Sequence, residues 1–199
     1  FEQFVNAFIE RTKNIKVGDP LKNETEIGPI ASKQHMERIL SYANLAEQDG
    51  DEILVGGKRL SNQENGYFIE PTAVLAKSNN SRTCQEEIFG PFASFVSFKT
   101  EEEAINLAND TEFGLVSYVW SDHMPTILKV SDAMRSGVVW VNTPMMRELR
   151  APFGGFGNSG VGREGGYSCE QFYTEEKTVS IPKSPLTLKG YGRQPNEGD

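Results

Sequence analysis

Residues 93–142 read ASFVSFKTEEEAINLANDTEFGLVSYVWSDHMPTILKVSDAMRSGVVWVN, and this stretch decides the fold. Short apolar runs, typical of strands, alternate in it with longer amphipathic runs, typical of helices. The expected strands are 93–98, 114–120 and 137–142. Because strands separated by short helices require crossover connections, the sequence predicts an α/β fold with a mostly parallel sheet and flanking helices.

Polar residues mark where the intervening helices begin. Thr100 followed by Glu103 forms a capping box, which predicts a helix through Asn109. Asp122 is the expected N-cap of a second helix through Met134.

The N-terminal part of the chain also contains helical patterns. Apolar residues at helical spacing from Phe1 predict a helix ending near Lys16, before the breakers Gly18 and Pro20. Ser32 is the expected cap of a second helix, which runs to about Gln48. Extended segments are expected at 51–55 and 67–75.

The C-terminal part is less regular. Residues 143–166 form a long irregular segment, and such segments inside compact domains are usually functional or disordered. A helical turn near Tyr167–Phe172 and a last strand at Lys177–Ile181 are expected after it. The remaining tail, rich in Pro, Gly and polar residues, is expected to be loosely held.

Composition excludes several classes of protein. The 199 residues carry 20 Lys and Arg against 28 Asp and Glu, a net charge of −8. An acidic chain without a basic cluster argues against nucleic-acid binding, and no apolar run is long enough to span a membrane. Two cysteines do not make a disulfide framework, so we expect a reducing, cytoplasmic location.

A chain that begins with Phe1 in a helical pattern, without Met, is expected to be a fragment.

Gly155–Gly160 matches the G-x-G-x-x-G pattern of dinucleotide-binding loops. That fingerprint needs a strand immediately before it and a helix immediately after it. Here the preceding strand is expected to end near Asn142, and more glycines follow. We therefore interpret the glycines as sites of sharp turning and close backbone approach rather than as a phosphate loop.

The segment Gln85–Pro91 contains a more specific pattern, two adjacent carboxylates followed by an aromatic residue and a Gly-Pro turn. An ionised Glu87 could accept two hydrogen bonds from a vicinal diol such as a ribose, and Phe89 could pack against a flat ring. The plainer alternative is a solvated acidic turn with a core phenylalanine. The residues by themselves favour that alternative.

Nucleophile and metal chemistry find little support in the sequence. Cys84 has no neighbouring histidine to act as a base, and Cys169 has an acidic neighbour, so each is expected to be a small hydrophobic residue. His35 and His123 are isolated on predicted helices. We therefore expect no catalytic cysteine and no metal site in this chain.

Two arginines precede the Pro-Phe-Gly-Gly segment of the irregular region. Arg147 and Arg150 are three residues apart, and together they could clamp a carboxylate or a phosphate. The alternative, about as well supported by the residues, is surface ion pairing with Glu148 or Glu164.

Taken together, these segments resemble the C-terminal part of the NAD(P)-dependent aldehyde dehydrogenase superfamily over nearly the whole chain, to about Ile181. The residues that carry the resemblance are Gly18-Asp19-Pro20, Gly28-Pro29, Gln85–Pro91, Trp140-Val141-Asn142, Pro152–Gly155 and Ser159–Glu164. The sequence around the arginines is most similar to the family's dehydrogenases of muconic semialdehydes, whose substrates carry carboxylates.

The resemblance implies a role for particular residues. Glu87 would bind the nicotinamide ribose of NAD, or of NADP, and Phe89 would pack near the nicotinamide, which reverses the preference for a solvated acidic turn. Phe153 would line the substrate tunnel, and Arg150, with Arg147 beside it, would contact the substrate carboxylate. The resemblance also implies three parts: a catalytic-domain portion (1–173), a strand that pairs between subunits of a homodimer or tetramer (174–182) and a loose tail (183–199).

The resemblance also implies what this chain lacks. The family's nucleophilic cysteine and general base belong to a preceding segment, so the chain alone is expected to be inactive. One alternative is a non-catalytic interaction module with the same fold that assembles through its last strand. Another is a related acyl-phosphate reductase.

Overall fold

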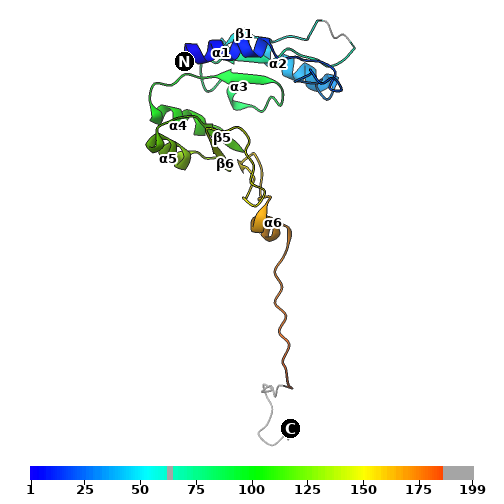
Figure 1. The fold of residues 1–199 in the computed structure, drawn as a ribbon, viewed down its shortest axis with the longest axis vertical. Coiled ribbons are helices and arrows are strands. Elements are labelled where there is room, and N and C mark those ends of the chain that lie inside the picture. The colour runs from blue at the N-terminus through cyan, green and yellow to red at the C-terminus, as the bar shows by residue number, and fades with distance from the viewer. Residues whose placement is uncertain (62–64, 186–199) are drawn as a thin grey trace, which may run out of the picture.

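A three-stranded sheet organises the N-terminal part of the chain. The computed structural model describes residues 1–61 and 65–185. In this sheet β1 (Glu52–Val55) pairs antiparallel with β2 (Thr72–Leu75), and β2 pairs parallel with β3 (Phe92–Phe95). The helices α1 (Glu2–Lys13) and α2 (Lys33–Asp49) lie alongside the sheet (Figure 1).

The core of this part lies under α2. Apolar residues of α2 recur at helical spacing, so one face of the helix is buried. This face packs with residues from the chain around β2 and β3, and the cluster consists of Met36, Ile39, Tyr42, Ile69 and Ile88. On α1, Phe8 packs edge-to-face on Phe95 of β3, with ring centroids 5.0 Å apart. Both helices are therefore held to the sheet by apolar contacts.

The second part confirms the predicted strand-helix-strand unit. β5 (Val116–Val119) and β6 (Val138–Val141) pair in parallel, and α5 (Met124–Ala133) connects them. The neighbouring α4 (Glu101–Asn109) packs against α5. Tyr118 and Trp140 are partners in the strand register, and their ring centroids are 5.2 Å apart.

The α/β fold is observed, and its strands form three small sheets in the described residues. Two pairings are parallel, β2–β3 and β5–β6, and the second is the one that the strand-helix-strand pattern predicts. The pairing β1–β2 is antiparallel because a loop, not a helix, connects those strands. The short strands β4 (Phe113–Gly114) and β7 (Phe156–Gly157) also pair antiparallel.

Helix capping confirms two predictions and corrects a third. The Ser32 hydroxyl accepts the backbone N–H of His35 at 3.2 Å, and Thr100 accepts that of Glu103 at 3.1 Å. The prediction that Asp122 caps α5 is wrong, because the N-cap is His123 and makes no side-chain cap hydrogen bond. Pro125 lies in the first turn of that helix, where a missing N–H costs nothing. The first helix ends at Lys13 instead of near Lys16.

The two parts are joined by amide hydrogen bonds around α3 (Arg82–Gln85). Gln85 donates its side-chain N–H to the carbonyl oxygens of Asn79 at 2.7 Å and Asp110 at 2.8 Å. Asn79 donates to the carbonyl of Leu107 at the end of α4 at 3.2 Å. The segment before Glu86 is therefore tied to both parts of the molecule.

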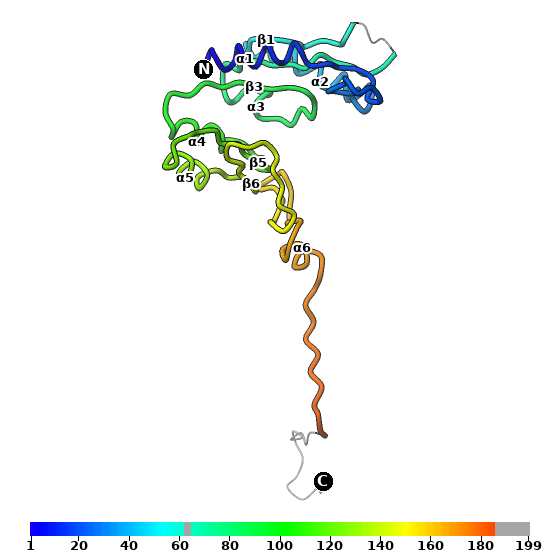
Figure 2. Tube along the Cα trace, viewed as in Figure 1, coloured from blue at the N-terminus to red at the C-terminus, as the bar shows by residue number. Residues whose placement is uncertain are grey.

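The C-terminal segment leaves the body of the molecule. After α6 (Gly166–Tyr173), residues 174–185 run outward as an extended chain (Figure 2). Among the described residues, none pairs in a ladder with the predicted strand Lys177–Ile181. Most of the predicted loose tail, 186–199, lies outside the described residues. No helix in the described ranges is long and apolar enough to cross a membrane.

Candidate functional site

The turn after α3 exposes the two residues predicted to bind the cofactor. Ile88 is buried in the core cluster, and this places the side chains of Glu87 and Phe89 on the solvent side. Phe89 is 80% exposed, although it is a large apolar residue. The alternative of a core phenylalanine is therefore wrong, because Ile88 occupies the core position instead.

The position of α3 depends on a buried carboxylate that the sequence analysis missed. Asp51 is 7% exposed and accepts three hydrogen bonds, from the Lys77 backbone N–H at 2.8 Å, the Ser81 hydroxyl at 2.8 Å and the Thr83 hydroxyl at 3.0 Å. A buried carboxylate is tolerated only when its oxygens are hydrogen-bonded, so these three bonds are needed. Because Asp51 follows α2 and its hydroxyl partners lie at the start of α3, the bonds connect the two helices.

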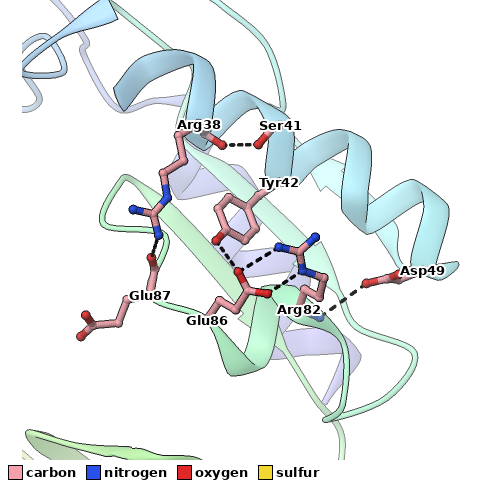
Figure 3. A network of polar contacts seen from close by, with 7 residues as sticks. All are labelled: Arg38, Ser41, Tyr42, Asp49, Arg82, Glu86 and Glu87. Carbon is pink, nitrogen blue, oxygen red and sulfur yellow. Dashed lines mark hydrogen bonds and ion pairs between the residues drawn. The ribbon is translucent and has the colours of Figure 1, made fainter. Parts of the chain in front are cut away.

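Glu86, next to Glu87, has a structural role (Figure 3). Its carboxylate accepts hydrogen bonds from the Tyr42 hydroxyl at 2.7 Å and the Arg82 guanidinium at 2.5 Å. These hydrogen bonds, from Arg82 first and Tyr42 second, lower the pKa of Glu86 to about 2, so its carboxylate stays ionised near neutral pH. The side chain of Glu87 points away from this network.

The backbone of the turn is held by two side chains of α2. The His35 Nε2 lies 2.8 Å from the Phe89 carbonyl oxygen, and the Arg38 Nη2 donates to the Glu87 carbonyl oxygen at 3.0 Å. Phe89 has φ +61°, a left-handed conformation that is uncommon for an aromatic residue. The turn is thus held in an unusual conformation by contacts outside itself.

Glu87 borders a cavity of about 230 Å³ between the two parts of the molecule. The cavity is also lined by residues of α4, β4, β5, the Gly-rich loop and the turn between α5 and β6, among them Asn109, Gly114, Ser136 and Ser159. A free carboxylate at its edge can accept two hydrogen bonds from a vicinal diol. Phe89 lines a separate cavity of about 400 Å³, and its exposed ring offers a flat apolar face. This arrangement fits a ribose and an attached aromatic ring.

Neither cysteine has the surroundings of an activated thiol. Burial raises the pKa of Cys84, which disfavours the thiolate form that would act as a nucleophile. Within residues 1–61 and 65–185, no three His, Cys, Asp or Glu side chains come together as a metal ion would require.

Arg147 and Phe153 are brought together by the irregular segment. The Arg147 guanidinium lies 4.6 Å from the centre of the Phe153 ring and 3.7 Å from a Glu164 carboxylate oxygen. Phe153 and Glu164 exchange two backbone hydrogen bonds of 2.7 Å, and the Trp140 indole donates to the Met146 carbonyl at 2.6 Å. The loop is thereby attached to β6 and to the Gly-rich segment.

Arg150 points to solvent and pairs with its neighbour Glu148. Its guanidinium donates to the two Glu148 carboxylate oxygens at 2.7 and 2.8 Å, and its side chain is 88% exposed. The surface ion pairs weighed in the sequence analysis are therefore present for both arginines. A substrate contact by Arg147 or Arg150 stays a prediction.

The glycines of residues 154–166 allow close backbone approach, as predicted. A Cβ atom on Gly154 would lie 2.6 Å from the carbonyl oxygen of Gly162, and one on Gly155 would lie 2.6 Å from that of Ser159. Within the G-x-G-x-x-G pattern, Phe156 and Gly157 form β7, and the next helix begins only at Gly166. The order of strand, loop and helix that a dinucleotide fingerprint requires is not found here.

The structure groups the predicted residues in two neighbouring places. Glu87 lines one cavity and Phe153 another of about 210 Å³, and Leu115 and Ser159 line both. The contacts of His35 and Arg38 with this turn were not predicted, because they join α2 to a segment about 50 residues away. The sequence offered one signal for these contacts: residues three apart on a helix lie on the same face and can contact the same neighbouring segment.

A family profile, curated proteins and solved structures were compared with this chain, and all three comparisons find the same kind of protein. The profile of the "Aldehyde dehydrogenase family" matches residues 1–179. A 2-aminomuconic 6-semialdehyde dehydrogenase from Pseudomonas sp is 42% identical over 184 residues, which cover 91% of this chain and 38% of the relative. The chain thus spans about 38% of the length of that relative.

Solved structures share the fold. The crystal structure of HpcC from Thermus thermophilus superposes with a TM-score of 0.88 at 38% identity, covering 97% of this chain and 38% of that one. A betaine aldehyde dehydrogenase from Staphylococcus aureus, solved in complex with NAD+, gives a TM-score of 0.89 at 36% identity and covers 96% of this chain and 39% of that one.

Proposed function

Since this chain belongs to the aldehyde dehydrogenase family, we propose that it is the C-terminal, catalytic-domain portion of an NAD-dependent enzyme that oxidises an aldehyde to an acid. The observation that carries the proposal is the turn that presents Glu87 and Phe89 side by side to solvent. Residues 1–173 are assigned to this portion.

The residues of the turn fit the cofactor. Glu87 would hold the hydroxyls of the nicotinamide ribose through its free carboxylate, and Phe89 would pack near the nicotinamide ring. Bound NAD supplies the hydride acceptor of the reaction, and NADP fits these two residues equally well. The similarity to a betaine aldehyde dehydrogenase solved with NAD+ supports the assignment.

The proposed substrate is a semialdehyde that carries a carboxylate, of the muconic type. Two relatives, from Pseudomonas sp and Mus musculus, are 2-aminomuconic semialdehyde dehydrogenases, and 5-carboxymethyl-2-hydroxymuconate semialdehyde is a second compound of this class. Phe153 would line the substrate tunnel, and Arg150 or Arg147 would exchange its glutamate partner for the substrate carboxylate. Exposed ion pairs are weak enough to be exchanged in this way.

The chain needs further residues for the reaction. In the described residues, Cys84 is half-buried with a raised pKa, and Cys169 has no ionised base hydrogen-bonded to it. We propose that the nucleophilic cysteine and the general base come from a segment outside this chain, that the chain alone does not oxidise aldehydes, and that the whole enzyme is cytoplasmic.

The Glu87→Gln substitution in the full-length protein tests the cofactor assignment. We expect the Kd for NAD to rise by about 10- to 100-fold, because a neutral amide offers one acceptor oxygen where the carboxylate offers two charged ones. The Kd is measured by titrating the fluorescence of NADH and displacing it with NAD.

Glu37→Gln is the matched control, since it also removes one exposed negative charge but lies on the outer face of α2, where Glu37 pairs with Lys33. It should leave the Kd unchanged. Equal NAD affinity in Glu87→Gln and the unsubstituted protein would reject the cofactor role and favour a non-catalytic interaction module.

We further propose that residues 174–182 pair with a second copy of the chain. This segment is extended and exposed, and within the described ranges its backbone makes no ladder hydrogen bonds. Unpaired backbone donors and acceptors in an extended chain are suited to strand addition.

Val179→Pro in the full-length protein is expected to reduce the oligomer to smaller species, because proline removes a ladder donor. Val179→Ala shortens the same side chain and keeps the N–H, so it should retain the assembly. Molar mass from light scattering after gel filtration distinguishes the two. An unchanged mass for the proline variant contradicts pairing through this segment.

A further inference from the structure

Two side chains of α2 hold the backbone of the turn that carries Glu87 and Phe89. His35 and Arg38 lie one helical turn apart, and each contacts one carbonyl oxygen of the turn, those of Phe89 at 2.8 Å and Glu87 at 3.0 Å. The two contacts are therefore on the two residues assigned to the cofactor, and both act on the backbone. Figure 3 shows the Arg38 contact, with the Glu87 carboxylate pointing away from it.

The turn needs such support because its conformation is unfavourable by itself. Phe89 has φ +61°, and a left-handed conformation costs free energy for a residue with a Cβ atom. Ile88 anchors one side of the turn in the core. Without the contacts from α2, the carbonyl groups on either side of Ile88 could rotate and the exposed side chains would change direction.

The close approach of α2 to the turn depends on Gly90. A Cβ atom there would lie 2.5 Å from Cδ1 of Ile39, a residue that is 2% exposed. Because Gly90 has no side chain, the turn sits directly on the helix, within reach of His35 and Arg38. Packing and hydrogen bonding thus act on the same few residues.

We propose that His35 and Arg38 are positioning residues that set the directions of Phe89 and Glu87 for cofactor binding, and that they act through the two backbone carbonyls. The proposal rests on the proposed function. The His35 contact requires a proton on Nε2, which both the neutral Nε2–H form and the imidazolium provide.

A double-mutant cycle between His35 and Phe89 in the full-length protein tests the proposal. His35→Ala should raise the Kd and the KM for NAD by about 3- to 10-fold, the loss expected for one hydrogen bond, with a smaller change in kcat. In the double variant with Phe89→Ala, His35→Ala should raise the Kd for NAD little further. A residue that acts only by orienting the Phe89 ring has no effect on binding once that ring is removed. His35→Gln, whose amide can donate to the same carbonyl, should recover part of the affinity.

The same cycle applies to Arg38 and Glu87. Arg38→Ala should weaken NAD binding, Arg38→Lys should restore it in part, and neither should add to the effect of Glu87→Gln. Lys33→Ala is the control, because Lys33 is an exposed cation on the same helix and pairs with Glu37. It should bind NAD as the unsubstituted protein does.

The outcomes separate the two proposals. If Glu87→Gln and Phe89→Ala leave NAD affinity unchanged, the proposed function of the turn fails. If those two variants weaken binding while His35→Ala and Arg38→Ala do not, only the positioning role is wrong. Additive effects in both cycles would show direct contact of the α2 side chains with the cofactor, and would also overturn positioning through the backbone.

Discussion

Gly90→Ala should destabilise the chain by about 1–3 kcal/mol, the usual range for an added methyl group in a packed interior. The new Cβ atom would lie 2.5 Å from Cδ1 and 2.9 Å from Cγ1 of Ile39. The backbone of Gly90 does not have a positive φ, so the expected cost comes from packing and not from backbone strain.

The same geometry predicts a rescue. Ile39→Ala by itself should cost about 2–5 kcal/mol, because it leaves a cavity in the core cluster. In the double variant the Gly90→Ala methyl group enters the space that Ile39 leaves. The combined loss should therefore be clearly smaller than the sum of the two single losses.

The midpoint of urea unfolding, followed by circular dichroism, measures these effects on the 199-residue chain. Gly28→Ala is the matched control, since its Cβ atom would lie 3.6 Å from the Pro20 side chain, an ordinary van der Waals distance. Additive losses in the double variant would mean that the Gly90 contact with Ile39 is not what makes glycine necessary.

Gly137→Ala should be at least as damaging, with a loss of about 3 kcal/mol or more. The added Cβ atom would lie 1.6 Å from the carbonyl oxygen of Gly154 and 3.5 Å from that of Leu115. Both are backbone atoms, which cannot rotate away as a flexible side chain can. The start of β6 would be forced away from the Pro-Phe-Gly-Gly segment.

This substitution should also affect the proposed substrate site, because Gly154 directly follows Phe153. In the full-length protein we expect a higher KM for the aldehyde and a lower unfolding temperature than in the Gly28→Ala control. If the Gly137→Ala variant has the same unfolding temperature and the same KM for the aldehyde as the Gly28→Ala control, the close approach of the two backbones is not present in the folded enzyme.

Local signals made much of the fold predictable from the sequence. Capping by Ser32 and Thr100 depends on residues within three positions, and both caps are observed. The alternation of strand and helix patterns over residues 93–142 predicts the parallel pair β5–β6, because a helix between two strands allows that pairing. The family was likewise predictable from short motifs in a constant order.

Other features required the tertiary structure, because they depend on contacts between distant segments. The sequence does not show which of two adjacent glutamates is free, whereas the structure pairs Glu86 with Tyr42 of α2 and leaves Glu87 exposed. It also does not show that Phe89 points outward, since this follows from the burial of Ile88 under the same helix.

The sequence by itself therefore determined most of the helices, the parallel unit β5–β6, the family and the candidate residues of the site. The tertiary structure decided how those residues are presented: which carboxylate is free, which ring is exposed and which side chains of α2 hold the turn. The physical reason is the separation along the chain between the residues that interact. Caps and periodic patterns act within one or two turns of a helix, whereas the direction of a side chain on a turn is set by packing and hydrogen bonds across about 50 residues of chain.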